Sequence, residues 1–125
     1  MSAAVVVMLA LAGGLGAGAR FVLDGAIRAR GRTTLPVGTM LINVSGSLVL
    51  GLLAGLVLAN RLPAEVQTVA GTGFLGGYTT FSTASVETVR LIQSGRPGTG
   101  LLNALGTMVL ALAAAAGGLA AGLAL

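Results

Sequence analysis

The sequence of 125 residues contains no cysteine and no histidine, which excludes disulfides, cysteine-based catalysis and metal ligation by thiolate or imidazole. Charge is also scarce, because only 8% of the residues are charged and the acids number three, Asp24, Glu65 and Glu87. No phosphate-binding Walker loop, nucleophile–base pair or redox-cofactor motif is present. These absences argue against an enzyme.

The chain is instead rich in long apolar segments. Hydrophobic residues make up 55% of it and its mean hydropathy is +1.00, which is typical of a membrane protein. A membrane-spanning helix needs about 20 apolar residues, and four segments qualify, at about 3–23, 37–59, 66–89 and 98–123. The connections are short, so residues 1–125 are predicted to form a single all-α transmembrane domain in the cell inner (plasma) membrane. The first segment has no basic residues before it, so we interpret it as a retained helix rather than a signal peptide.

The basic residues are all arginine and give a formal net charge of +4. In a soluble protein this excess would suggest nucleic-acid binding, but here the arginines flank apolar segments, so no nucleic-acid partner is expected. Arg61 lies on one side of the predicted membrane, whereas the loops on the opposite side carry Arg28, Arg30, Arg32, Arg90 and Arg96. By the positive-inside rule, both termini are predicted to lie outside the cytoplasm.

Glycine is abundant, with 21 residues, and several recur at every fourth position. Gly14 and Gly18 form one pair, and Ser47, Gly51 and Gly55 form a longer series. This spacing lets helices approach closely in lipid, so it predicts tight helix packing. Four thin helices bury little by themselves, which also favours an oligomer.

Polar side chains lie inside two of the predicted spans. In the second span, Thr39, Asn43 and Ser47 recur at every fourth position and therefore share one helix face. A hydrogen bond between helices would explain Asn43 without any function. The alternative is a polar path for a small ion, which the third span also suggests.

Residues 71–83 read Gly-Thr-Gly-Phe-Leu-Gly-Gly-Tyr-Thr-Thr-Phe-Ser-Thr in the middle of the third span. Two adjacent glycines, Gly76 and Gly77, lower helix propensity and predict a break in the helix at mid-membrane. A break would free carbonyls for a hard monovalent cation, or N–H groups and hydroxyls for an anion. A kink healed by Ser/Thr bonds to the backbone remains open. Phe81 could present its positive ring edge to an anion.

No acid, lysine or histidine lies centrally in any predicted span. Proton-coupled transporters commonly use a titratable group there, so passive permeation through a neutral path is favoured. A small multidrug-type exporter is one alternative, but it would need a carboxylate in the first span, and Asp24 lies beyond that span. A structural assembly protein is a second alternative, which leaves the polar stripe unexplained.

The sequence resembles the Fluc (CrcB) family of fluoride channels over nearly its whole length. The resemblance rests on Gly-Gly-Leu-Gly-Ala-Gly-Ala-Arg-Phe at 13–21 and Pro-Val-Gly-Thr-Met-Leu-Ile-Asn-Val-Ser-Gly at 36–46. It also rests on Gly-Phe-Leu-Gly-Gly-Tyr-Thr-Thr-Phe-Ser-Thr at 73–83, which is highly specific, and on Glu87.

The resemblance implies a fluoride-selective channel that passively exports cytoplasmic fluoride and so lowers its toxicity. It implies an antiparallel dimer of four-helix subunits in the lipid membrane, with two pores. A structural sodium ion would be held by the backbone carbonyls of Gly76 and Thr79, and Arg20 would lie at a vestibule. The fluoride path would be lined by Thr39, Asn43, Thr80, Phe81 and Ser82.

Two departures from the family pattern concern the pore. The family usually continues with a second phenylalanine where this chain has Ala84, and its fourth helix often carries hydroxyls where the stretch after Asn103 and Thr107 is rich in alanine and leucine. A homodimer must also insert the same chain both ways, which the five-to-one arginine bias opposes. The alternative to a homodimer is a heterodimer with a paralogous subunit.

Overall fold

The computed structural model describes residues 1–31 and 35–125, and every regular element in these ranges is helical. Arg32, which contributed to the predicted arginine bias, lies outside the described residues. Three helices are long and apolar enough to cross a membrane: α1 (Ala3–Arg30), α2 (Val37–Leu58) and α6 (Pro97–Ala124). The prediction of an all-α membrane protein is therefore confirmed at this level.

The boundaries of these helices follow local chemistry. Ser2 caps α1, because its hydroxyl accepts a hydrogen bond from the Val5 N–H at 3.2 Å. Proline precedes α2 as Pro36 and begins α6 as Pro97, where a missing N–H is harmless. The first helix continues beyond the apolar segment at 3–23 as far as Arg30, and Arg28 and Arg30 in its last turn suit the negative end of the helix dipole.

The segment between α2 and α6 is divided into several elements. It contains α3 (Ala64–Val66), the π-helix η1 (Gln67–Leu75), α4 (Gly76–Tyr78) and α5 (Phe81–Gln93). Between the start of α3 and the end of α5, the backbone is extended at Thr79 (φ −80°, ψ 157°) and Thr80 (φ −148°, ψ 116°). The predicted position of the break is thus wrong by about one turn, because Gly76 and Gly77 are helical.

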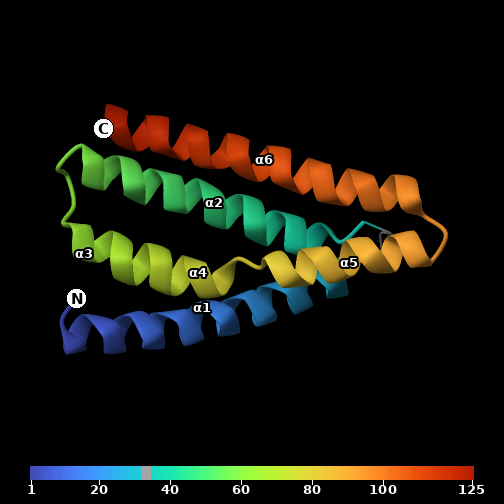
Figure 1. Ribbon diagram of the computed structural model, residues 1–125, viewed down its shortest axis with the longest axis horizontal. Coiled ribbons are helices and arrows are strands. Elements are labelled where there is room, and N and C mark those ends of the chain that lie inside the picture. The colour runs from blue at the N-terminus through green and yellow to red at the C-terminus, as the bar shows by residue number, and fades with distance from the viewer. Residues whose placement is uncertain (32–34) are drawn as a thin grey trace.

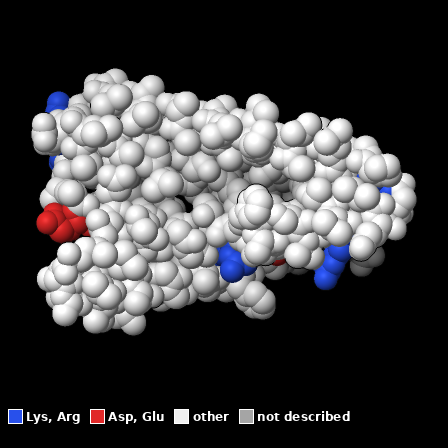
Figure 2. Space-filling model, in the orientation of Figure 1, with Lys and Arg blue, Asp and Glu red and all other residues white. Residues whose placement is uncertain are grey.

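The helices form a layered arrangement in which α6, α2, the α3–α5 segment and α1 follow one another (Figure 1). Both termini and the turn after α2 lie at one end of the molecule, and the α5–α6 turn lies at the other. The face in Figure 2 is almost entirely uncharged, and its few charged side chains gather at the ends and along one edge. Such a surface suits lipid rather than water.

Glycines determine how closely the helices pack. A Cβ on Gly51 would overlap the Ala115 carbonyl oxygen, and one on Gly118 would overlap that of Leu48, so α2 and α6 are in backbone contact. Gly16 and Gly77 bring α1 equally close to η1 and α4. Packing at Gly51 and Gly55 agrees with the predicted series, since a Cβ on Gly55 would also meet α6.

The predicted pair Gly14 and Gly18 does not pack within this chain. A Cβ at either position would meet nothing within 4 Å. The helix face of α1 that contacts its neighbours is instead the face of Gly13 and Gly16, which approach Gly73, Phe74 and Gly77.

Candidate functional site

The interruption after Tyr78 is held by the side chain of Asn43. Asn43 Oδ1 accepts a hydrogen bond from the Thr80 N–H at 2.8 Å, and Asn43 Nδ2 donates to the Thr80 carbonyl at 2.9 Å. The amide therefore pairs with both backbone groups of one extended residue, as a neighbouring strand would. The Asn43 amide has two hydrogens, and only one of them is used in the bond to the Thr80 carbonyl.

Hydroxyls complete the start of α5. Thr80 Oγ1 accepts from the Thr83 N–H at 3.1 Å and so caps the helix. The same hydroxyl donates to Thr83 Oγ1 at 3.1 Å and lies 3.3 Å from Ser82 Oγ. Three polar residues, Thr80, Ser82 and Thr83, thus bond to one another locally, and the Thr83 N–H keeps a partner although the helix is interrupted.

Carbonyls on the N-terminal side of the break lose their helical donors. A continuous helix would pair the Gly76 carbonyl with the Thr80 N–H and the Thr79 carbonyl with the Thr83 N–H. Those N–H groups bond instead to Asn43 Oδ1 and Thr80 Oγ1. The Gly76 and Thr79 carbonyls, which were predicted from sequence as cation ligands, are therefore among the carbonyls that lose a helical donor, although the break lies beyond Gly76.

A cavity of about 650 Å³ lies beside the break, between α2, α5 and α6. Its polar lining includes Asn43 and Ser47 from α2, Thr79 and Thr80 from the break, Thr88 from α5, and Asn103 and Thr107 from α6. Ala84 also lines it. No side chain in this lining is charged.

Two polar residues of α6 were not among the predicted site residues. Asn103 is 1% exposed and donates to Thr88 Oγ1 at 2.9 Å, which joins α6 to α5. Thr107 is also buried, and its hydroxyl oxygen has no hydrogen-bond partner within residues 1–31 and 35–125. Their spacing of four residues was visible in the sequence and places both on one helix face.

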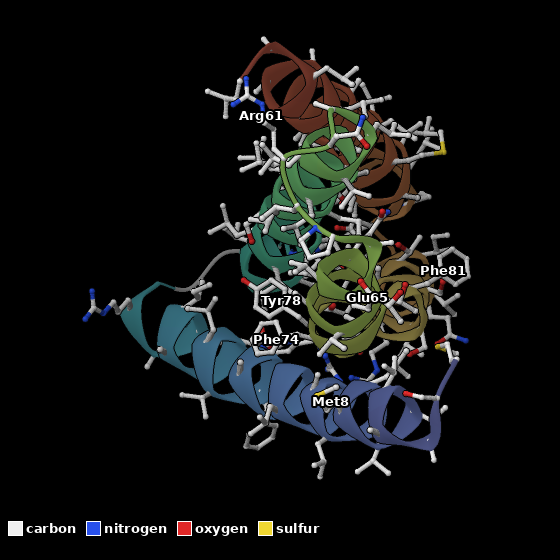
Figure 3. The ribbon with its side chains drawn as sticks, turned by 90° about the vertical axis from the view of Figure 1, so that its left-hand side faces the viewer. Met8, Arg61, Glu65, Phe74, Tyr78 and Phe81 are labelled. Carbon is white, nitrogen blue, oxygen red and sulfur yellow. The ribbon has the colours of Figure 1, made fainter. Side chains whose placement is uncertain are left out.

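Phe81 lies at the rim of the same cavity with its side chain uncovered. It is 88% exposed, so its ring packs against almost nothing in this chain. Figure 3 shows Phe81 on one side of the α3–α5 segment and Phe74 and Tyr78 on the other. The second side has its own smaller cavity of about 330 Å³, where Tyr78 and Ser45 share a hydroxyl contact of 3.0 Å.

The remaining predicted residues lie at other points. Arg20 is half-buried and its Nε donates to the Gly77 carbonyl at 3.4 Å, close to the break. Thr39 is 3% exposed and donates to Glu87 Oε1 at 2.5 Å rather than pointing into the large cavity. The structure therefore gathers Asn43, Thr79, Thr80 and Phe81 around one cavity, with Thr39 one helical turn away from Asn43.

The sequence is similar to those of known proteins over most of its length. Residues 7–119 match the family described as "CrcB-like protein, Camphor Resistance (CrcB)". The chain is 55% identical over 119 residues to "Fluoride-specific ion channel FluC 1" of Leifsonia xyli subsp. xyli, covering 95% of this chain and 87% of the relative. It is 48% identical over 114 residues to "Fluoride-specific ion channel FluC 2" of Cutibacterium acnes, covering 90% and 92%.

A third relative is more distant but equally complete in coverage. "Fluoride-specific ion channel FluC 2" of Mycobacterium tuberculosis is 41% identical over 115 residues, which cover 92% of this chain and 88% of the relative. Because the family match extends over nearly the whole sequence and the relatives align end to end, the chain belongs to the CrcB family.

Proposed function

We propose that the chain is a subunit of a fluoride-selective ion channel that lets cytoplasmic fluoride leave the cell passively. The observation that carries this proposal is the uncharged polar cavity beside a helix break, in a chain whose curated relatives bear the name of fluoride channels. Hydroxyl and amide donors can replace the water of a small anion. A path without titratable groups has no group that could gain and lose a proton, as a pump or a proton-coupled exporter requires.

Fluoride efflux from proteoliposomes tests this proposal. We expect the reconstituted chain, alone or with a paralogous subunit, to release fluoride much faster than chloride and without need of a pH gradient. Efflux that requires a proton gradient would favour the exporter alternative. No efflux under either condition would favour a structural membrane protein.

We propose that the α3–α5 segment forms a fourth membrane crossing. It runs alongside α1 and α2 from one end of the molecule to the other (Figure 1), and Asn43 pairs with the N–H and the carbonyl of Thr80 at its break, as a bilayer interior favours. Of the arginines predicted to face the cytoplasm, Arg28, Arg30, Arg90 and Arg96 lie at the end opposite the termini. The positive-inside rule then supports termini outside the cytoplasm of an inner-membrane protein.

We propose that the channel is an antiparallel dimer and that this chain pairs with a paralogous subunit. An uncovered Phe81 at the cavity rim suits insertion into a partner, and Ala84 leaves the cavity without the family's second aromatic. The arginine bias favours insertion in one orientation. Cysteine labelling of a tag on this chain expressed alone tests the point, and equal labelling from both membrane sides would favour the homodimer.

A structural sodium ion between the subunits fits the residues present. Sodium prefers neutral or anionic oxygen ligands, and the Gly76 and Thr79 carbonyls have lost their helical donors to Asn43 and Thr80. When bound, the ion would hold the two breaks together by its charge. Each subunit contributes the carbonyl pair, and the Asn43 clamp keeps that pair released.

Removal of sodium is therefore expected to weaken the dimer. We expect replacement of sodium by N-methylglucamine during purification and recording to lower fluoride flux by about tenfold, equivalent to about 1.4 kcal/mol. The measurement is fluoride flux at constant ionic strength, with sodium added back as the control. Flux and dimer mass that are unchanged over long dialysis would contradict a sodium site.

A further inference from the structure

A charged cluster joins three helices at the end of the molecule opposite the termini. Arg28 of α1 lies at its centre, with Nε 2.9 Å from Asp24 Oδ2 and Nη2 3.2 Å from Glu87 Oε2 of α5. Thr39 of α2 donates to the other oxygen of Glu87 at 2.5 Å. Both oxygens of Glu87 are thus occupied, one by a hydroxyl and one by a guanidinium.

Asp24 anchors this cluster against α2. Its Oδ1 is buried and has no hydrogen-bond partner in the described part of the chain, and it contacts Gly38 so closely that any Cβ there would overlap it. Gly38 lies in the first turn of α2, where the helix dipole favours a negative charge. The carboxylate is held between two helices, so Arg28 is bonded to a fixed support rather than to a mobile surface group.

Glu87 lies at the end of the polar stripe of α2. Thr39, to which it is bonded, precedes Asn43 by four residues, or about 6 Å along the helix axis. The Glu87 side chain is 12% exposed, whereas that of Arg28 is 59% exposed. Water therefore screens the carboxylate little, and its charge acts strongly on any ion that reaches Thr39.

We propose that Arg28 is a positioning residue for the anion path: it holds Glu87 on Thr39 and compensates its negative charge at this mouth of the channel. The inference rests on the proposed fluoride channel. Arg28 is suited to this role because a guanidinium can bond two carboxylates at once. In the described residues the other arginines of this end, Arg30, Arg90 and Arg96, make no ion pair with Glu87.

Loss of Arg28 leaves two carboxylates, Asp24 and Glu87, without an ion-pair partner among residues 1–31 and 35–125. An anion must then approach an uncompensated negative charge at short range, which raises the barrier to entry. We expect Arg28→Gln to lower fluoride flux by about tenfold, a change that about 1.4 kcal/mol in the barrier would produce. Arg28→Lys keeps the charge and is expected to lose much less.

The test is a double-mutant cycle on fluoride flux in proteoliposomes of the full chain, with its paralogous subunit if the wild type requires one. The four members are wild type, Arg28→Gln, Glu87→Gln and the double variant. Arg30→Gln is the matched control, because it removes the same charge from the same helix end and leaves the cluster intact. Gel-filtration profiles establish that each variant remains folded.

The proposal expects Arg28→Gln to reduce flux in the wild-type background and to have a clearly smaller effect once Glu87 is glutamine, because only Asp24 then loses its cation. Equal losses in the two backgrounds would overturn it, since a purely structural role of Arg28 would persist without the Glu87 charge. Equal effects of Arg28→Gln and Arg30→Gln would overturn it too. If the wild type itself passes no fluoride, the proposed channel function fails, which is a separate result.

Discussion

Replacing Asn43 by leucine is expected to abolish fluoride flux and to destabilise the fold. Leucine has the same number and branching of side-chain heavy atoms but cannot pair with the Thr80 N–H and carbonyl, which Asn43 bonds at 2.8 and 2.9 Å. Each backbone group left unpaired in a buried site costs about 1–3 kcal/mol, so about 2–6 kcal/mol is expected for the two. The amide donor beside the cavity is lost as well.

The loss of fluoride flux in Asn43→Leu should be larger than the loss caused by replacing any neighbouring polar residue. A rise of about 3 kcal/mol in the barrier corresponds to a reduction of more than about a hundredfold in flux. Fluoride efflux and thermal unfolding in detergent measure the two effects. Ser47→Ala is the matched control, because Ser47 lines the same cavity one turn further along α2 and makes no hydrogen bond in the described residues. Similar losses in both variants would contradict the assigned role of Asn43.

Adding one methyl group at Gly118 is expected to have the second large effect. A Cβ there would overlap the Leu48 carbonyl oxygen and lie 2.8 Å from the Leu52 backbone nitrogen, and backbone atoms of α2 cannot turn aside as a side chain would. The helices must separate, which loses contacts along the α2–α6 pair. We expect Gly118→Ala to lower the free energy of unfolding by about 3 kcal/mol, at the upper end for overpacked sites.

The adjacent glycine provides the control for this prediction. A Cβ on Gly117 would meet nothing within 4 Å, and alanine favours a helix over glycine by about 1 kcal/mol. Gly117→Ala should therefore leave stability unchanged or raise it slightly. The measurement is unfolding by a graded series of denaturing detergent. Equal destabilisation at the two positions would mean that helix propensity or lipid contact, rather than the close approach at Gly118, controls stability here.

The sequence was informative about which segments are helical and less so about where the third one breaks. Apolar runs indicated the long helices α1, α2 and α6, because that signal is local, although α1 continues beyond the predicted end at 23 to Arg30. The prediction based on Gly76 and Gly77 put the break about one turn too early in the chain. Gly77 stays helical because the absence of a side chain lets it contact the Gly13 carbonyl of α1, a packing contact that outweighs low helix propensity.

The partners across the site could not be read from spacing. Asp24 and Arg28 are four residues apart, so their ion pair was foreseeable, but the bond from Arg28 to Glu87 joins residues 59 positions apart. The bond from Asn43 to Thr80 joins residues 37 apart. Both depend on how α1, α2 and α5 are placed in space. The polar residue types at Thr39, Asn43 and Thr80 were visible in the sequence, whereas their pairing required the fold.

The central claim is that fluoride passes along the break beside Asn43. The reversal potential of the current in a planar bilayer tests this claim most directly. With a tenfold gradient of sodium fluoride and no pH gradient, the account predicts a current that reverses at about 59 mV in magnitude, with the sign for an anion, and that disappears in Asn43→Leu. A reversal potential of cation sign, or no fluoride current from the chain with or without a paralogous subunit, would contradict it.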